Sequence, residues 1–126
     1  MTLLCVPIFV ADVHSALRDA HAAKDLGADL VEFRIDDIFS GTDAVTPVGE
    51  PPQSEAASIL QLTSDSPLPC IVTCRPAGPE GGHYDGPDDA RISLYERLGT
   101  AFGSGEQPPR DIDLELSTWQ RSANIQ

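Results

Sequence analysis

Residues 69–75 read PCIVTCR, and residues 76–82 continue as PAGPEGG. The first segment is an apolar run with β-branched residues that ends in an arginine, and the second is a loop rich in glycine and proline. This pattern is typical of a buried parallel strand whose carboxyl end carries function. Because side chains alternate along a strand, Ile71, Thr73 and Arg75 share one face. Arg75, with Glu80 just beyond it, indicates a small anionic or polyhydroxylated ligand.

Length and charge restrict the class of protein. At 126 residues the chain can form one small domain or part of a larger one. Its formal net charge of −12 argues against a nucleic-acid partner and against an anionic membrane surface, because both require clustered lysine and arginine. An acidic surface most often serves solubility alone. The apolar run at residues 3–10 is too short to span a bilayer, and no basic segment precedes it as in a signal peptide.

The three cysteines, Cys5, Cys70 and Cys74, all fall in apolar runs, and their number is odd. This usage predicts buried, reduced thiols in a cytoplasmic protein. Cys70 and Cys74 do not form a metal pair, because four steps along one strand separate them by about 13 Å. We expect no metal site elsewhere either. The acids among residues 83–89 lack EF-hand spacing, and Pro87 marks them as residues that start a helix.

Strands and helices are expected to alternate along the whole chain. Asp12 is suited to cap the amino end of a helix, Gly27 is suited to end it, and Pro87 suits the first position of a later helix. The expected strands are residues 3–10, 29–35, 69–75 and 111–116, and the expected helices are about residues 12–26, 54–63 and 87–102, with residues 117–126 as the opening of a fourth helix. Such alternation predicts parallel β/α units.

Two architectures fit these units: a doubly wound sheet, and the first half of an eight-stranded TIM (β/α)8 barrel. Three of the expected strands carry charged side chains on one face: Glu32 with Arg34, Arg75 with the polar Thr73, and Asp113 with Glu115. A doubly wound sheet favours apolar residues on both faces, whereas a barrel turns one face inward, where charges near the carboxyl ends form a site. We therefore predict an α/β chain that forms half a TIM barrel. Residues 1–126 would be one partial domain that stops at about the fourth helix, since a whole barrel takes about 250 residues.

The ends of these strands carry the candidate chemistry. Glu32 can accept hydrogen bonds from substrate hydroxyls, and Arg34 can donate to a ketone, a carboxylate or a neighbouring acid. The alternative is a structural ion pair inside the barrel. Arg75 is expected to hold a ligand oxygen or else to pair with Glu32. Glu80 is expected to orient a histidine that acts as acid and base, or else to be a solvated loop acid.

Other candidates for proton transfer or covalent catalysis are weaker. His14 and His21 fall within the first expected helix, where a solvated surface position is the ordinary case. His83 is the only histidine near the expected mouth of the site. Lys24 is the only lysine. We expect it in the last turn of an outer helix beside Asp25, where it complements the helix dipole and does not form an imine.

Four separate motifs together resemble those of type I 3-dehydroquinate dehydratase. They are EFRID at residues 32–36, IVTCR at 71–75, EGG at 80–82 and IDLEL at 112–116. The resemblance runs from Leu4 to about Ile125 and covers only the first half of the family's barrel. The family converts 3-dehydroquinate to 3-dehydroshikimate in the shikimate pathway of aromatic amino acid biosynthesis. A lysine forms a Schiff base with the substrate and a histidine moves the proton, with no metal or organic cofactor.

The resemblance also implies roles for individual residues. Glu32 and Arg34 match the family's substrate-contacting pair, Arg75 its third-strand arginine, Glu80 the glutamate that hydrogen-bonds the catalytic histidine, and Asp113 an aspartate near that histidine. One departure lies between Arg75 and Glu80, which are separated by one residue more than in the family. The extra residue is expected at Gly78–Pro79. This insertion affects the direction in which the Glu80 side chain points.

No residue of this chain matches the family's catalytic histidine or imine-forming lysine, which lie on later strands. We therefore expect this half-barrel to be inactive by itself, with 3-dehydroquinate as its ligand. Its expected partner is a complementing carboxyl-terminal half or a second copy in a homodimer. The alternatives are a non-catalytic, self-associating half-barrel that binds a small polyol acid, and a flavodoxin-like module that binds a small ligand. The last of these would require a doubly wound sheet.

Overall fold

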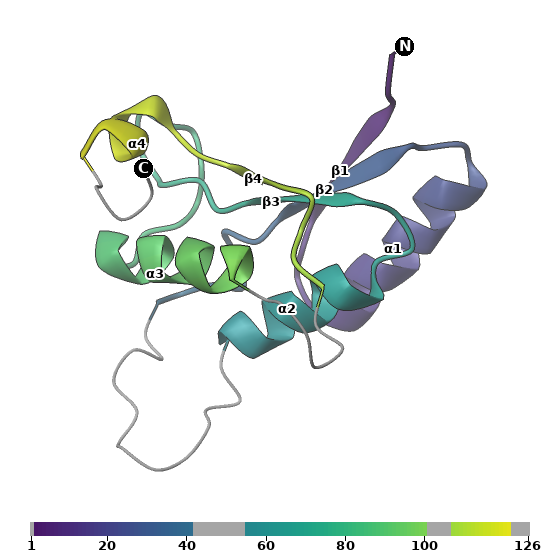
Figure 1. Cartoon of the computed structure of the whole chain (residues 1–126), viewed down its shortest axis with the longest axis horizontal. Helices are drawn as coiled ribbons and strands as arrows, with labels where there is room; N and C mark the ends of the chain where they lie inside the picture. The colour runs from purple at the N-terminus through teal and green to yellow at the C-terminus, as the bar shows by residue number, and fades with distance from the viewer. Residues whose placement is uncertain (1, 42–54, 101–106, 122–126) are drawn as a thin grey trace.

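The computed structural model describes residues 2–41, 55–100 and 107–121. Four parallel strands form one sheet in the order β1-β2-β3-β4, and helices alternate with them along the chain (Figure 1). The strands are β1 (Cys5–Phe9), β2 (Leu30–Arg34), β3 (Cys70–Thr73) and β4 (Asp111–Asp113). The helices are α1 (Val13–Asp25), α2 (Glu55–Asp65), α3 (Asp88–Gly99) and α4 (Leu116–Arg121). Within the described residues, no helix has the length and apolar character needed to cross a membrane.

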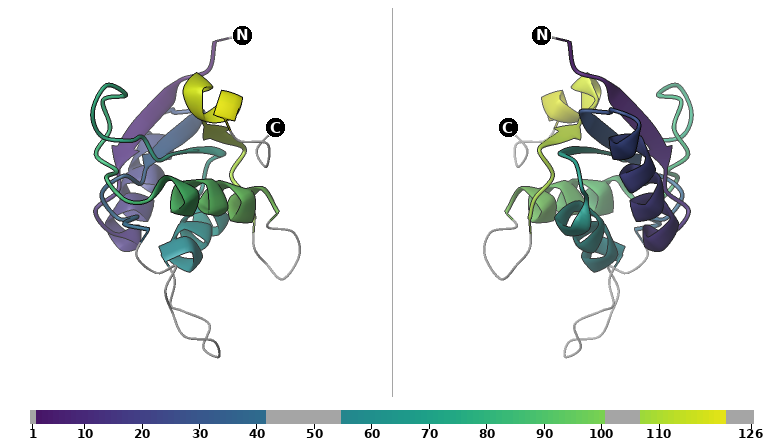
Figure 2. Two further views of the ribbon diagram at one scale, coloured as in Figure 1. Left: turned by 90° about the vertical axis from the view of Figure 1, so that its left-hand side faces the viewer. Right: turned by 90° about the vertical axis from the view of Figure 1, so that its right-hand side faces the viewer.

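The strand order distinguishes the two expected architectures. Each strand pairs in parallel with the next one in the chain, and α1, α2 and α3 all lie on one face of the sheet (Figures 1 and 2). A doubly wound sheet reverses its winding direction and carries helices on both faces, whereas a barrel winds in one direction with its helices outside. The described part of the chain therefore has the winding of half a TIM barrel, as the charged strand faces predicted.

The two ends of α1 are formed by the residues that the sequence predicts, Asp12 and Gly27. The Asp12 carboxylate caps the helix, because its Oδ1 accepts the Ser15 backbone N–H at 2.8 Å and its Oδ2 accepts the Ser15 hydroxyl at 2.9 Å. These hydrogen bonds stabilise the charged form and lower the pKa of Asp12. Gly27 follows the helix with a φ of +99°, a left-handed conformation that other residues rarely adopt. The chain can thus turn at once into β2.

The core lies between the sheet and the helices. Val31, Phe33 and Ile35 project from β2 and its carboxyl end toward the helices, and each is 0% exposed. They belong to one hydrophobic cluster with the buried alanines of α1, which are Ala16, Ala20 and Ala23. These small side chains let the helix lie close to the sheet.

The opposite face of β1 is open. Cys5, Pro7 and Phe9 are exposed there. The prediction of three buried thiols is therefore confirmed for Cys70 and Cys74 and wrong for Cys5. The physical reason is that β1 is an edge strand, and the helices cover only the face from which Cys5 points away. Leu4 and Val10 bond to β2 through their backbones, so by alternation the nitrogen of Pro7 faces the unpaired edge. An edge strand tolerates proline in that position.

Several element boundaries differ from the expected ones. The third strand ends at Thr73 and the fourth at Asp113, so Arg75 and Glu115 lie beyond their strands. Pro87 is the N-cap of α3, with the helix beginning at Asp88, not its first helical residue. The expected helix residues Ser54 and Phe102 lie outside the described residues.

The positive φ of Gly27 generates a test with a matched control. A Cβ added at Gly27 or at Gly99, the last residue of α3, would meet no atom within 4 Å, so a clash plays no part at either site. Gly27→Ala should lower the free energy of unfolding by about 1 kcal/mol, because alanine is strained at that φ. Gly99→Ala should leave it unchanged or raise it by up to about 1 kcal/mol. Urea unfolding measures both, and equal effects would contradict the assigned turn.

Candidate functional site

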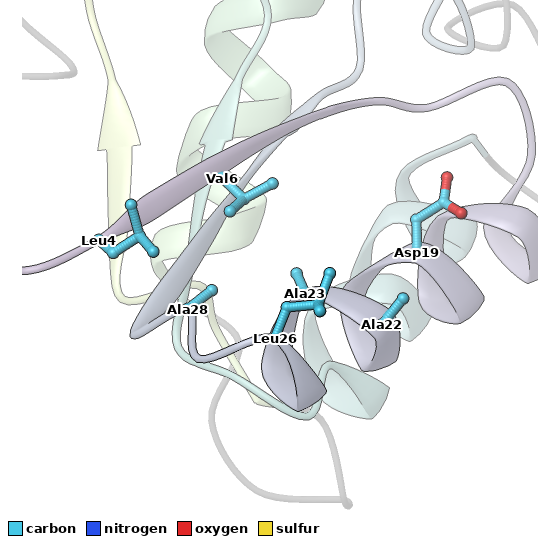
Figure 3. Close-up of a pocket in the computed structure, with 7 residues that line it drawn as sticks. All are labelled: Leu4, Val6, Asp19, Ala22, Ala23, Leu26 and Ala28. Atoms are coloured by element: carbon cyan, nitrogen blue, oxygen red, sulfur yellow. The ribbon is translucent and has the colours of Figure 1, made fainter.

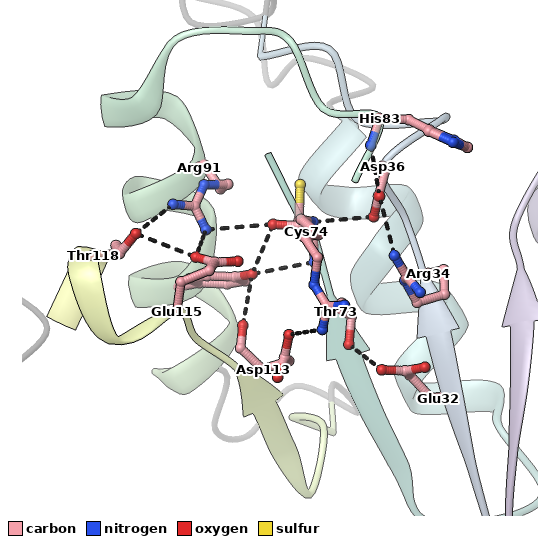
Figure 4. A network of polar contacts seen from close by, with 12 residues as sticks. Glu32, Arg34, Asp36, Thr73, Cys74, His83, Arg91, Asp113, Glu115 and Thr118 are labelled. Atoms are coloured by element: carbon pink, nitrogen blue, oxygen red, sulfur yellow. Dashed lines mark hydrogen bonds and ion pairs between the residues drawn. The ribbon is translucent and has the colours of Figure 1, made fainter. Parts of the chain in front are cut away.

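Polar side chains gather where β2, β3 and β4 end (Figure 4). The register places Arg34 beside Thr73 and Thr73 beside Asp113, so these residues form one row across three strands. The row lies on the face of the sheet that the helices leave open. In a barrel this face is the interior, and the carboxyl ends of the strands carry the active site.

Glu32 and Arg34 do not form the ion pair that was the structural alternative. The Thr73 hydroxyl donates to Glu32 Oε2 at 2.7 Å. Arg34 turns instead to Asp36, with Nη2 at 3.5 Å from Oδ2, and its guanidinium lies over the Phe9 ring at 5.2 Å. Arg34 Nε is buried and has no hydrogen-bond partner among the described residues. Hydrogen-bonding capacity is therefore left at one oxygen of Glu32 and at the buried Nε of Arg34.

Arg75 pairs with Asp113, not with Glu32. Its Nη2 donates to Asp113 Oδ2 at 2.9 Å, and the two side chains are 34% and 36% exposed. The hydrogen bond to Asp113 raises the pKa of Arg75, so the guanidinium stays charged. The structure thus brings four of the five candidate residues to one edge: Glu32, Arg34, Arg75 and Asp113.

Glu80, the fifth candidate, is not brought to this cluster. It is exposed in a turn closed by the Gly81 N–H bonding to the Gly78 carbonyl at 3.0 Å, and the described residues offer its carboxylate no ion pair. The turn is anchored at Gly82, where an added Cβ would lie 1.9 Å from the Arg75 carbonyl oxygen. Only glycine permits this approach. The EGG motif therefore folds back onto the backbone of Arg75, although Glu80 itself points to solvent.

His83 and Lys24, which the sequence analysis does not favour as catalytic residues, lie away from the polar row. His83 Nδ1 lies 3.1 Å from Asp37 Oδ1, and its ring points away from the other labelled residues in Figure 4. Lys24 is exposed in the last turn of α1, on the helical layer. Among the described residues, no group of three or more metal-ligating side chains forms a metal site.

Helix α3 contributes residues that sequence reasoning missed. Arg91 is fully buried, and its guanidinium bonds to Glu115 Oε2 at 2.7 Å, the Thr118 hydroxyl at 2.8 Å and the Cys74 carbonyl at 3.4 Å. The prediction that Glu115 shares the inner face with Asp113 is wrong, because β4 ends at Asp113 and the chain then turns Glu115 toward Arg91. The spacing of Asp113 and Glu115 in the sequence does not indicate that the strand ends between them.

Tyr95 and Cys74 complete the inner support of the site. The Cys74 N–H donates to the Tyr95 hydroxyl at 3.2 Å, and that hydroxyl donates to the Asp113 carbonyl at 3.0 Å. Burial raises the pKa of Tyr95, so the hydroxyl remains a donor. Burial also raises the pKa of Cys74 to about 12, which makes its thiol a poor nucleophile at neutral pH. These residues position the site and are not suited to react.

A separate groove of about 250 Å³ lies between α1 and β1 (Figure 3). Its lining is apolar except for one carboxylate, and consists of Leu4, Val6, Asp19, Ala22, Ala23, Leu26 and Ala28. None of these residues belongs to the polar row. The groove therefore offers packing surface and no convergent chemistry.

The sequence profile of the type I 3-dehydroquinase family matches residues 4–125. The chain belongs to this family. It is 33% identical over 117 residues to the 3-dehydroquinate dehydratase of Methanothermobacter thermautotrophicus, covering 93% of this chain and 43% of that protein. It is 36% identical over 109 residues to the 3-dehydroquinate dehydratase of Haloquadratum walsbyi, covering 86% and 39%.

The match to a plant relative also covers most of this chain and only a small part of the relative. The chain is 31% identical over 115 residues to the chloroplastic bifunctional 3-dehydroquinate dehydratase/shikimate dehydrogenase of Arabidopsis thaliana, covering 91% of this chain and 16% of that protein. The chain thus spans less than half the length of the relatives it matches.

The buried Arg91–Glu115 pair generates a stability test. Arg91→Met leaves the Glu115 carboxylate, itself only 7% exposed, without its cation, and should lower the free energy of unfolding by about 3 kcal/mol. Adding Glu115→Met should recover most of the loss, because the uncompensated charge is gone. Arg110→Met is the control. Arg110 is half exposed and pairs with Asp111 at 3.5 Å, so its loss should cost less than about 1 kcal/mol.

Urea unfolding of the four proteins measures these effects. If Arg91→Met and Arg110→Met cost the same, the α3 contacts do not support the ends of β3 and β4 as described.

Proposed function

We propose that this chain is the amino-terminal half of a 3-dehydroquinate dehydratase, with residues 1–126 as one partial domain that supplies the substrate-binding side of the site. The observation that carries the proposal is the convergence of Glu32, Arg34 and Arg75 at one edge of the sheet in a chain of this family. These are the residues that match the family's substrate contacts.

The chemistry of 3-dehydroquinate suits this half-site. The molecule carries hydroxyl groups, a ketone and a carboxylate. One oxygen of Glu32 accepts the Thr73 hydroxyl, and its second oxygen would accept a ligand hydroxyl. Arg34 and Arg75 would donate to a ketone or a carboxylate, because a guanidinium recognises such oxygens through several N–H groups.

Glu80 and Asp113 are proposed as partners of a histidine contributed from outside this chain. Asp113 already lies in the polar row and is bonded to Arg75, which supports a place beside the reacting atoms. Glu80 lies in a turn that the Gly82 contact fixes against Arg75, but its carboxylate is exposed. Its role therefore requires a partner element that covers this turn.

We assign the reaction steps to residues contributed from outside this chain. The family resemblance implies a Schiff-base lysine and a proton-transferring histidine. Lys24 on α1 and His83 beside Asp37 both lie apart from the row, and neither is proposed for these roles. We therefore propose that the chain is inactive by itself, needs no cofactor, and works in the cytoplasm, where its three free cysteines would stay reduced.

A second candidate is a non-catalytic half-barrel that self-associates while binding a small polyol acid. The observation in its favour is the open face of β1, where Cys5, Pro7 and Phe9 are exposed. Among the described residues, β1 and β4 are the edges of the sheet, and each edge would accept a further strand. Turnover separates the two candidates, because this one binds ligand without turnover under any complementation. Sizing separates it from a monomeric ligand-binding module.

The first test measures 3-dehydroshikimate formation from 3-dehydroquinate by ultraviolet absorbance. We expect no turnover by the purified chain, and turnover when the carboxyl-terminal half of a relative, such as the Methanothermobacter thermautotrophicus enzyme, is added. Turnover by the chain alone would contradict the assignment of the lysine and histidine to another segment, with Lys24 and His83 as the first residues to test. Absence of turnover in both cases would contradict the proposed enzyme.

In the complemented enzyme, Arg75→Ala should lower kcat/KM by roughly 10- to 100-fold, since it removes a charged donor to substrate. The unfolding midpoint should change little, because Arg75 is one-third exposed. Arg110→Ala is the matched control at an exposed position beside β4 and should stay within about twofold of the unaltered enzyme. Equal kinetics for the two variants would remove Arg75 from the site.

A further inference from the structure

Asp36 joins three segments of the candidate site. It follows β2 directly, and its carboxylate is 4% exposed. Oδ1 accepts the backbone N–H of Arg75 at 3.1 Å, and Oδ2 accepts the backbone N–H of His83 at 3.0 Å. Oδ2 also lies 3.5 Å from Arg34 Nη2. One buried carboxylate therefore touches the end of β2, the end of β3 and the loop that follows β3 (Figure 4).

The contacts of Asp36 take the place of backbone hydrogen bonds beyond the last rung between β2 and β3. The last rung between β2 and β3 is the Ile35 N–H donating to the Thr73 carbonyl at 2.9 Å. The next N–H on the β3 side, that of Arg75, is accepted by the Asp36 side chain and not by the backbone of the β2 side. A charged acceptor at this point satisfies a buried donor and fixes the residue that carries it.

We propose that Asp36 is a positioning residue for substrate binding: it sets the directions of Arg34 and Arg75 and holds the loop at residues 76–83 over the site. The proposal rests on the proposed function, since it assigns these arginines to the substrate. Asp36 acts on Arg34 through its side chain and on Arg75 through its backbone, so loss of the carboxylate disturbs both arginines at once.

The carboxylate is required because both of its oxygens face N–H donors. Asparagine has the same shape, but it keeps only one acceptor oxygen and presents an NH2 group to the other donor. Asp36→Asn therefore tests charge and acceptor number with little change of volume. Asp37→Asn is the control at the next position. The Asp37 carboxylate is half exposed and contacts only the His83 ring among the contacts described, so its replacement leaves both backbone bonds of Asp36 intact.

The experiment uses the 126-residue chain labelled with 15N, and 3-dehydroquinate as the probe. Amide exchange reports the backbone bonds, the arginine Nε–H signals report the two side chains, and a titration reports affinity. For Asp36→Asn we expect amide exchange at Arg75 and His83 to rise about tenfold or more, because a hydrogen bond to a charged group is lost. We also expect both arginine signals to shift and the affinity for 3-dehydroquinate to fall about tenfold. Asp37→Asn should change none of these.

Each other outcome is decisive. If Asp36→Asn lowers only the unfolding midpoint and leaves the arginine signals and the affinity unchanged, Asp36 is merely structural and the proposal is overturned. If the unaltered chain does not bind 3-dehydroquinate, the substrate-binding half of the proposed function fails. The exchange rates and arginine signals still decide whether Asp36 positions Arg34 and Arg75. If Asp36→Asn does not fold, Asp36→Glu replaces it, and unshifted arginine signals there would overturn the proposal.

Discussion

The backbone hydrogen-bond ladder between the strands stops close to the carboxyl ends of β2, β3 and β4, and the buried groups beyond it still require partners. Side chains supply them. Asp36 accepts the Arg75 N–H, the Tyr95 hydroxyl bonds the Cys74 N–H and the Asp113 carbonyl, and Arg91 donates to the Cys74 carbonyl. The carboxyl edge of the sheet is thus built by side chains from the β2 end and from α3. These contacts satisfy backbone groups beyond the strand ends, and they gather polar side chains at that edge (Figure 4).

The arginine side chains at this edge are also paired. Arg34 faces Asp36, Arg75 faces Asp113 and Arg91 faces Glu115, so each arginine near the edge has its own acid. Glu32 has a hydroxyl partner and no cation within 4 Å among the described residues. It is therefore the charged group at this edge with most to gain from a ligand's donors. Arg75 and Asp113 remain partly exposed, and a ligand can compete for their bond, whereas the Arg91–Glu115 pair is buried and serves the scaffold.

Much of the fold and part of the site follow from sequence, for identifiable reasons. The helices and strands are predicted by the alternation of β and α patterns, by the Asp12 cap and by Gly27. The half-barrel winding is predicted by charges at every second residue near the strand ends. Glu32, Arg34, Arg75 and Asp113 were found because their spacing shows on a strand. Asp36, Arg91 and Tyr95 were missed, because their partners are backbone groups or lie far along the chain. Glu115 was misplaced and Cys5 was expected to be buried, since strand length and edge position depend on tertiary pairing.

The most direct measurement is an NMR titration of the 126-residue chain with 3-dehydroquinate that maps where the ligand binds. We expect the largest shifts at Glu32, Thr73 and Arg75, on β2 and at the carboxyl end of β3. Shifts confined to the alanines of the α1 groove, Ala22, Ala23 and Ala28, or no shifts at any concentration, would contradict the claim that the carboxyl edge of this sheet is a substrate-binding half-site.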